Sequence, residues 1–164
     1  MTTFAEWCSE QGMDISFHHH MGTAVETEQD VDLLMNYSGE AVKLLYDAGH
    51  MAFSGGDVFA IIEKHAKRIS HVHAKDVRLP IINKLNRNNE SFLDAVLKGA
   101  FTVPGDGSLD FYEIIKRLAG IGYEGWFVVE AEQDPVLAPP YEYACIGHRT
   151  LVNALTNAGY KIKE

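Results

Sequence analysis

Three consecutive histidines follow a short apolar segment near the start of the chain, and imidazoles serve both as metal ligands and as acid–base catalysts. They are His18, His19 and His20, and the segment 14–18 is predicted to form a strand. Because side chains alternate along a strand, His18 and His20 share one face and His19 lies on the other. His18 and His20 can therefore converge on one ligand, with His20 further out. The alternative is a polar loop without a function.

A carboxylate and an imidazole stand close together after the next apolar segment, VKLLYD. Asp47 ends this predicted strand, and His50 follows three residues later, across Gly49. These ligand types suit Mn, Co, Fe or Zn, and the lack of neighbouring cysteines argues against a structural zinc site. The spacing allows both side chains to meet one divalent ion or one substrate. The alternative is a helix-capping Asp47 and a surface His50.

A third predicted strand, 69–73, carries two imidazoles and leads into a lysine. His71, His73 and Lys75 share side-chain parity in this segment. Two imidazoles and an ammonium on one strand face are unusual as core residues. We therefore expect this face to end in the same region as His18 and Asp47.

The segment WFVVE, 126–130, is the most strongly predicted strand of the chain, and it ends in a carboxylate. Glu130 directly follows the apolar residues, and a carboxylate at that depth needs a cation or a hydrogen-bond donor. Glu132 shares its face but is equally consistent with a solvated loop residue. The sequence therefore predicts a functional role for Glu130 more strongly than for Glu132.

Capping residues and apolar periodicity predict helices between these strands. The predicted helices begin near Thr3, where Glu6 completes a capping box, and near Thr27, Asp57, Ser91, Asp110 and Tyr141. Residues 48–57 are predicted to be a loop, and His65 is predicted to be exposed on its helix. Four successive βα units favour a parallel sheet covered by helices, either doubly wound or part of a (β/α)8 barrel. Both folds bind ligands at the C-terminal ends of their strands, where these histidines and carboxylates fall.

Length and composition are those of one soluble globular domain. The chain has 164 residues, of which 46% are hydrophobic and 23% charged. Its net charge of -9 and scattered lysines and arginines make nucleic acid a poor partner. No apolar run approaches the roughly 20 residues that span a bilayer, and no signal peptide is evident, so we expect a cytoplasmic protein without a membrane partner.

Five motifs in a fixed order resemble the C-terminal half of the inosose dehydratase family, within the xylose isomerase-like (β/α)8 barrel superfamily. They are HHHMGT (18–23), YDAGH (46–50), HVHAKDVR (71–78), VPGDGSLDF (103–111) and WFVVEAEQDP (126–135). The resemblance implies an enzyme, a hydro-lyase that removes water from 2-keto-myo-inositol in inositol catabolism. It also implies a divalent metal, Mn or Co with Mg, Fe or Zn as alternatives, that acts as a Lewis acid and stabilises an enediolate.

The resemblance also assigns residues to this metal. Enzymes of the superfamily hold the metal through Glu, Asp, His and Glu at strand ends, and Asp47, His73 and Glu130 match three of these positions by motif. The first Glu position falls near His18, so His18 or His20 is the fourth ligand. For the catalytic acid or base, strand parity makes His20 the first candidate. Lys75 and His50 are the alternatives, and Lys75 could also hold a substrate hydroxyl.

Length separates this chain from complete members of the family, which form barrels of roughly 250 or more residues. Residues 1–164 are expected to be one domain that contains strands five to eight of such a barrel, a half barrel with open edges. A second copy could complete the barrel as a homo-oligomer. The alternatives are a sugar or keto-polyol isomerase or epimerase with the same ligands, or an inactive truncated module.

Overall fold

A four-stranded parallel sheet forms the centre of the computed structural model, which describes residues 1–163. Its strands are β1 (Ile15–His18), β2 (Val42–Asp47), β3 (Ile69–Ala74) and β6 (Phe127–Val129), in this spatial order. All three pairings are parallel, which requires a crossover between successive strands. The predicted α/β class with a parallel sheet is therefore confirmed.

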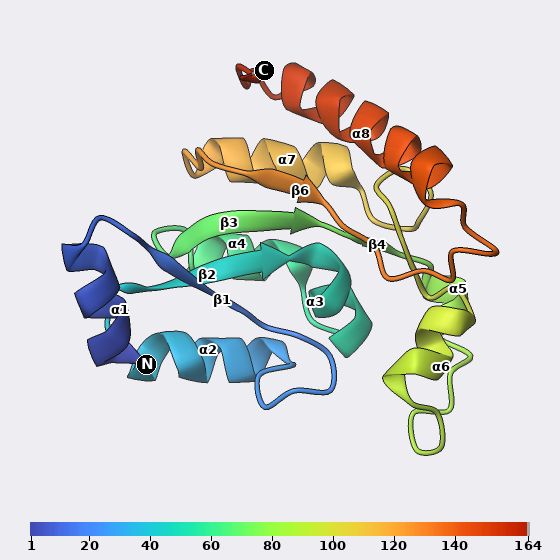
Figure 1. Ribbon diagram of the computed structural model, residues 1–164, viewed down its shortest axis with the longest axis horizontal. Helices are drawn as coiled ribbons and strands as arrows, with labels where there is room; N and C mark the ends of the chain where they lie inside the picture. Colours follow the sequence, from blue (N-terminus) through green and yellow to red (C-terminus); the bar gives the residue numbers. More distant parts are fainter. Residues whose placement is uncertain (164) are drawn as a thin grey trace.

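Helices provide the crossovers and cover the sheet (Figure 1). They are α1 (Thr2–Glu10), α2 (Glu28–Tyr37), α3 (Ala48–Ser54), α4 (Val58–Lys64), α5 (Leu79–Ile82), α6 (Phe92–Leu97), α7 (Phe111–Gly120) and α8 (Pro140–Asn157). Figure 1 shows α7 and α8 side by side beyond β6, and α5 with α6 near the end of the sheet toward which the strands point. None of these described helices is long and apolar enough to span a membrane.

The two faces of the sheet differ in chemistry. One face packs Leu44, Tyr46 and Val72 against helix residues that include Ile61 of α4 and Ile115 of α7, all of them fully or almost fully buried. Alternation places polar side chains on the other face, where the Ser16 and Ser70 hydroxyls lie 2.6 Å apart. The strand-end histidines and carboxylates share this polar face, which in a complete barrel is the interior.

Most helix starts follow their predicted caps, but the first does not. Thr27 and Ser91 each form a capping box, and the Asp57 and Asp110 side chains accept backbone N–H groups of α4 and α7. The predicted capping box at Thr3 is wrong: α1 begins at Thr2 without a side-chain cap.

Two further predictions are corrected. Residues 48–54 form α3 instead of a loop, because the Asp47 side chain accepts the His50 backbone N–H and starts the helix. His65 is buried instead of exposed, since its Nε2 atom lies 2.8 Å from Oδ1 of Asp32 on α2. The sequence predicts the Asp47 cap only as an alternative, and the contact with Asp32 could not be predicted from the residues near His65.

The segment 75–110 departs from the simple βα rhythm. It contains the antiparallel pair β4 (Asp76–Val77) and β5 (Phe101–Thr102), with α5 and α6 between them. A second hydrophobic cluster, which includes Phe53, Val77, Val96 and Phe101, holds this segment against α3. The insertion therefore has its own small core next to the C-terminal ends of the strands.

Candidate metal and active site

Side chains from four strands meet where the sheet ends. The Nε2 atom of His18 lies 3.3 Å from Oδ2 of Asp47, and Nδ1 of His73 lies 3.7 Å from the same oxygen. All three ligand atoms lie within 4.8 Å of one another. Glu130, directly after β6, places Oε2 at 3.5 Å from Nδ1 of His73. The structure thus brings together the four residues predicted to bind a metal.

The Asp47 carboxylate performs two tasks at once. Its Oδ1 atom accepts the His50 backbone N–H at 3.0 Å and caps α3, while Oδ2 faces His18 and His73. Burial alone would raise the pKa of Asp47, but the hydrogen bond from His18, the nearby His73 imidazole and the charge of Lys75 hold this pKa well below its usual range. Asp47 is therefore an anion at neutral pH, as a metal ligand must be.

His19, which follows β1, makes a hydrogen bond with the backbone of Asp47. It is fully buried, and its Nε2 atom accepts the Asp47 backbone N–H at 3.4 Å. Burial lowers the pKa of His19 to about 4, so this ring is neutral at pH 7. Strand parity predicted its separation from His18 and His20 but gave no role for it.

The donor set fits a divalent ion. Nδ1 of His73 is buried and has no hydrogen-bond partner among residues 1–163, although two carboxylates lie within 4 Å of it. Those carboxylates, Asp47 first and then Glu130, raise the pKa of His73 to about 9. Two imidazoles and two carboxylates are the ligand types that Mn, Co, Fe and Zn accept. Metal binding at this position would replace the His73 proton with another positive charge.

Lys75 is a buried cation at the centre of the site. Its Nζ atom lies 2.7 Å from Glu130 Oε2 and 3.5 Å from Asp47 Oδ2. It also donates hydrogen bonds of 2.6 Å to Glu132 Oε2 and 2.7 Å to His50 Nε2. Burial would lower the pKa of Lys75, but Asp47, Glu132 and Glu130 outweigh it and raise that pKa. Lys75 is thus suited to hold an anion or a hydroxyl, and not to remove a proton.

A second group of ligand-type side chains adjoins the first. The Nε2 atom of His20 lies 3.2 Å from Glu132 Oε1, and that of His50 lies 3.7 Å from the same oxygen. The His20 and His50 rings are packed together, with centroids 3.7 Å apart. Because Nε2 of His50 already accepts the Lys75 hydrogen bond, we interpret His20, His50 and Glu132 as acid–base groups and not as ligands of a second ion.

His20 and His50 differ in what they can do. His50 is fully buried, burial lowers its pKa to about 3, and its Nε2 accepts the Lys75 hydrogen bond. His20 is partly exposed, and its Nδ1 donates to the Met21 carbonyl at 2.8 Å. The Nε2 atom of His20 is therefore the one that can exchange a proton, with Glu132 beside it. This geometry favours His20 over His50 as acid or base.

All seven predicted site residues lie in this one region, and their roles remain predictions. Glu132 belongs with them although the sequence favoured Glu130 over it, and its shared parity with Glu130 was the available signal. Phe92 also reaches the site, with its ring centroid 5.3 Å from that of His20. No sequence pattern indicated Phe92, because it comes from the insertion between β4 and β5.

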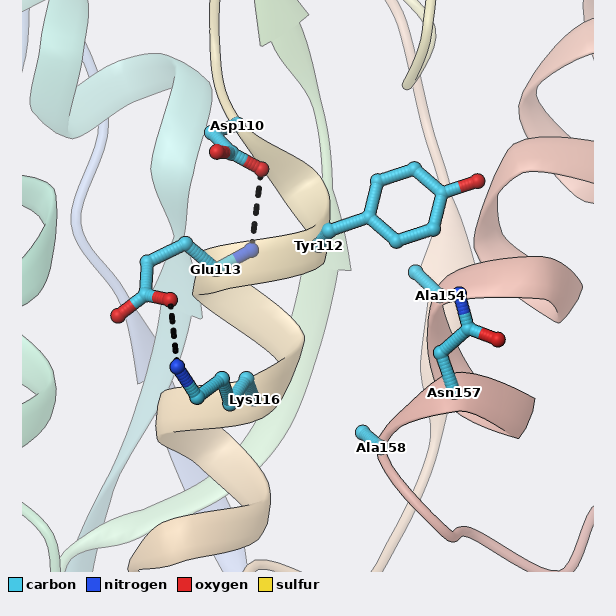
Figure 2. Close-up of a pocket in the computed structure, with 7 residues that line it drawn as sticks. All are labelled: Asp110, Tyr112, Glu113, Lys116, Ala154, Asn157 and Ala158. Carbon is cyan, nitrogen blue, oxygen red and sulfur yellow. Dashed lines mark hydrogen bonds and ion pairs between the residues drawn. The ribbon is translucent and has the colours of Figure 1, made fainter.

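A cavity on the outer helical layer is separate from this site. Figure 2 shows it between α7 and α8, with a volume of about 220 Å³. It is lined by Asp110, Tyr112, Glu113, Lys116, Ala154, Asn157 and Ala158. Asp110 accepts the Glu113 N–H of its helix, and Glu113 pairs with Lys116 at 3.2 Å. These are helix-capping and surface interactions, and none of the predicted site residues lines the cavity.

Comparison with known sequences agrees with this architecture. A family model described as xylose isomerase-like TIM barrel matches residues 1–158. The rhizopine catabolism protein MocC of Rhizobium meliloti is 53% identical over 164 residues, 100% of this chain and 50% of that protein. The inosose dehydratase of Geobacillus thermodenitrificans is 50% identical over 145 residues, 88% of this chain and 49% of that protein. The chain thus spans about half the length of the curated relatives it matches, and the predicted resemblance to inosose dehydratases is confirmed.

Solved structures agree on the fold. A crystal structure of an IolI protein with a bound zinc atom superposes with a TM-score of 0.71 at 17% identity, covering 98% of this chain and 55% of that one. The probable 3-DHS dehydratase AsbF of Bacillus anthracis gives a TM-score of 0.69 at 17% identity, covering 93% of this chain and 54% of that one. With four parallel βα units, a strand-end cluster and a family match over 158 residues, the chain belongs to the xylose isomerase-like TIM barrel family.

Proposed function

We propose that this chain is half of a metal-dependent hydro-lyase that removes water from 2-keto-myo-inositol. The observation that carries the proposal is the meeting of His18, Asp47, His73 and Glu130 beside a buried ammonium. The names of relatives about 50% identical to the chain, inosose dehydratases of several bacteria, give the reaction. The name of MocC refers to rhizopine catabolism and states no reaction.

The proposed metal is Mn or Co, held by His18, Asp47, His73 and Glu130. The ligand types fit such an ion, and the unpartnered Nδ1 of His73 faces the carboxylates that would share it. A divalent ion bound there supplies Lewis-acid polarisation of the substrate ketone. His20 lies outside the ligand group formed by His18, Asp47 and His73, so His18 is the proposed fourth ligand.

His20 moves the proton in the proposed reaction. Its Nε2 takes the proton from the carbon next to the ketone, while Nδ1 stays bonded to the Met21 carbonyl. The C–H electron pair becomes a carbon–carbon double bond as the β-hydroxyl leaves, and the leaving hydroxyl takes the proton back from His20 to form water. Glu132, 3.2 Å from Nε2, stabilises the protonated ring between these steps. Lys75 orients the hydroxyl groups through its ammonium.

A second copy of the chain is the proposed partner that closes the barrel. The edge strands β1 and β6 run parallel within one sheet, so a two-fold axis along the barrel would place β6 of one copy beside β1 of the other, again in parallel. Large apolar side chains are exposed near both edges, with Trp126 74% and Trp7 54% exposed. A dimer mass by light scattering supports this assembly, and a stable monomer contradicts it.

The function is tested by adding Mn²⁺ or Co²⁺ and 2-keto-myo-inositol to the metal-free protein. Dehydration forms a dione with a new ultraviolet absorbance, whereas an epimerase or isomerase returns a ketone without it. Growth of the absorbance that depends on metal and is lost in Glu130→Gln supports the hydro-lyase. An isomeric ketone as the product would instead establish the epimerase alternative.

A further inference from the structure

We propose that Phe92, on the insertion between β4 and β5, is a specificity-determining residue that gives the candidate site an apolar wall for a cyclic polyol. This inference rests on the proposed function, because it names the substrate class of the same site. It is carried by the contact of the Phe92 ring with the His20 and His50 pair, a contact that the proposed chemistry does not use.

The insertion is built to hold Phe92 in place. Phe92 is the first residue of α6, and Ser91 before it forms a capping box with Asp94. The Ser91 backbone N–H donates to Asp94 Oδ2 at 2.8 Å, and the Asp94 N–H donates to the Ser91 hydroxyl at 3.2 Å. Ala95 and Val96 of the same helix are buried in the second hydrophobic cluster. The capping box before Phe92 and the buried residues after it thus hold the first turn of α6 in place.

Phe92 faces the site, whereas the adjacent Leu93 faces outward. Its ring centroid lies 5.3 Å from that of His20, 6.2 Å from that of His50 and 5.5 Å from that of Phe101. Leu93, the next residue, is 61% exposed. Phe92 packs against the second hydrophobic cluster but is only half-buried, so part of its ring stays accessible. Phe92 also lines a neighbouring pocket of about 250 Å³, which none of the predicted site residues lines.

An apolar wall opposite charged groups suits a ring with equatorial hydroxyls. His20, Lys75 and Glu132 supply polar contacts, and Phe92, a partly exposed ring that packs on the fully buried Phe101, supplies the apolar surface. A six-membered polyol ring presents axial C–H bonds on its faces and hydroxyls around its rim, so it can satisfy both kinds of surface at once. An open-chain polyol must first lose rotational freedom to present a comparable face. The wall therefore favours the cyclic compound.

The experiment measures binding without turnover. Myo-inositol and the open-chain hexitol sorbitol, neither of which is a ketone, are titrated into the Co²⁺-loaded chain by calorimetry and saturation-transfer NMR. Phe92→Ala is compared with Leu93→Ala, a truncation at the adjacent exposed position. We expect Phe92→Ala to weaken myo-inositol binding about tenfold and sorbitol binding less than about threefold, and Leu93→Ala to change neither. Phe92→Leu, which keeps apolar volume, should recover part of the loss.

Three outcomes overturn the inference: no binding of myo-inositol to the wild-type chain, equal losses for both polyols, or equal effects of Phe92→Ala and Leu93→Ala. Thermal melting and the Co²⁺ spectrum of each variant test whether the fold and the metal site are intact. If both are unchanged, a loss of binding is caused by the loss of the Phe92 ring. If the wild type binds myo-inositol through Phe92 but does not dehydrate 2-keto-myo-inositol, the proposed function is wrong, whereas the role of Phe92 in binding a cyclic polyol is supported.

Discussion

Lys75 donates a hydrogen bond of 2.6 Å to Glu132, a residue 57 positions later in the chain. The contact joins the end of β3 to the segment after β6, and it places the ammonium among three carboxylates, since Asp47 and Glu130 lie within 3.5 Å of the same nitrogen. Removing the ammonium would leave three like charges facing one another. The buried cation therefore stabilises the site before any ion is bound.

Lys75→Gln should destabilise the metal-free protein by about 3 kcal/mol, because it removes the partner of partly buried carboxylates. Added Co²⁺ should restore part of this loss, since the ion replaces the missing positive charge. Urea unfolding with and without Co²⁺ measures both effects. Lys64→Gln is the matched control: Lys64 pairs with Glu28 and Asp32 at the surface, where solvent screens the ion pairs, so its loss should have a much smaller effect on stability. Equal effects of the two variants would show that Lys75 does not neutralise the site.

His20→Ala should lower the turnover number for 2-keto-myo-inositol by about a hundredfold or more, because His20 is partly exposed beside Glu132 and lies outside the ligand group formed by His18, Asp47 and His73. Steady-state kinetics at saturating substrate measure the change. His148→Ala, on the exposed side of α8, should leave turnover unaffected. A loss of less than about threefold in His20→Ala would remove His20 from the proposed proton transfer.

Gly107→Ala should destabilise the protein by about 1 to 3 kcal/mol. A Cβ atom at this position would clash with Asp76 Oδ1 and would lie 2.7 Å from the Val77 carbonyl oxygen, so the backbone would have to move. Gly120→Ala, at the end of α7, has no atom within 4 Å of its new Cβ and should be neutral or slightly stabilising. Thermal melting of both variants tests this contrast, and equal melting temperatures would contradict it.

Asp76→Asn should become more stable relative to wild type as the pH rises from about 4 to about 7. Burial raises the pKa of Asp76, although backbone N–H groups, that of Leu109 first, act against it. The favourable contribution of a carboxyl with a raised pKa is complete below its unfolded pKa of about 3.9 and is lost as the pH passes the folded pKa. Asn keeps an oxygen for these N–H groups and does not ionise. Urea unfolding at several pH values measures the free energy of unfolding of both proteins. A wild type that gains stability relative to Asp76→Asn as the pH rises would refute this explanation.

The sequence predicted the parallel sheet and the converging residues because both depend on local rules. Alternation along β1 separated His18 and His20 from His19, and the structure shows the rings of His18 and His20 with centroids 5.4 Å apart while His19 lies in the core. Strand ends in a parallel sheet meet at one edge, so Asp47 and Glu130 could be placed together without knowing their distance.

What the sequence could not predict depends on contacts between distant segments. α3 is the exception, because Asp47 caps it through a contact with His50 three residues later, which the sequence predicts only as an alternative to metal binding. His65 is buried by Asp32 on a helix 33 residues earlier. Phe92 reaches His20 only because the second hydrophobic cluster folds the insertion toward the site. Periodicity within a segment carries no information about such partners.

The most direct test of the metal site is a Co²⁺ titration of the metal-free chain, followed by visible absorption and thermal stability. Glu130→Gln removes a proposed ligand, and Glu132→Gln removes the neighbouring carboxylate that faces His20 and Lys75 instead. We predict a d–d spectrum that saturates near one ion per chain, with a matching rise in melting temperature, lost in Glu130→Gln and retained in Glu132→Gln. The absence of a saturable spectrum in the wild type, or a spectrum unchanged by Glu130→Gln, would contradict the proposed site.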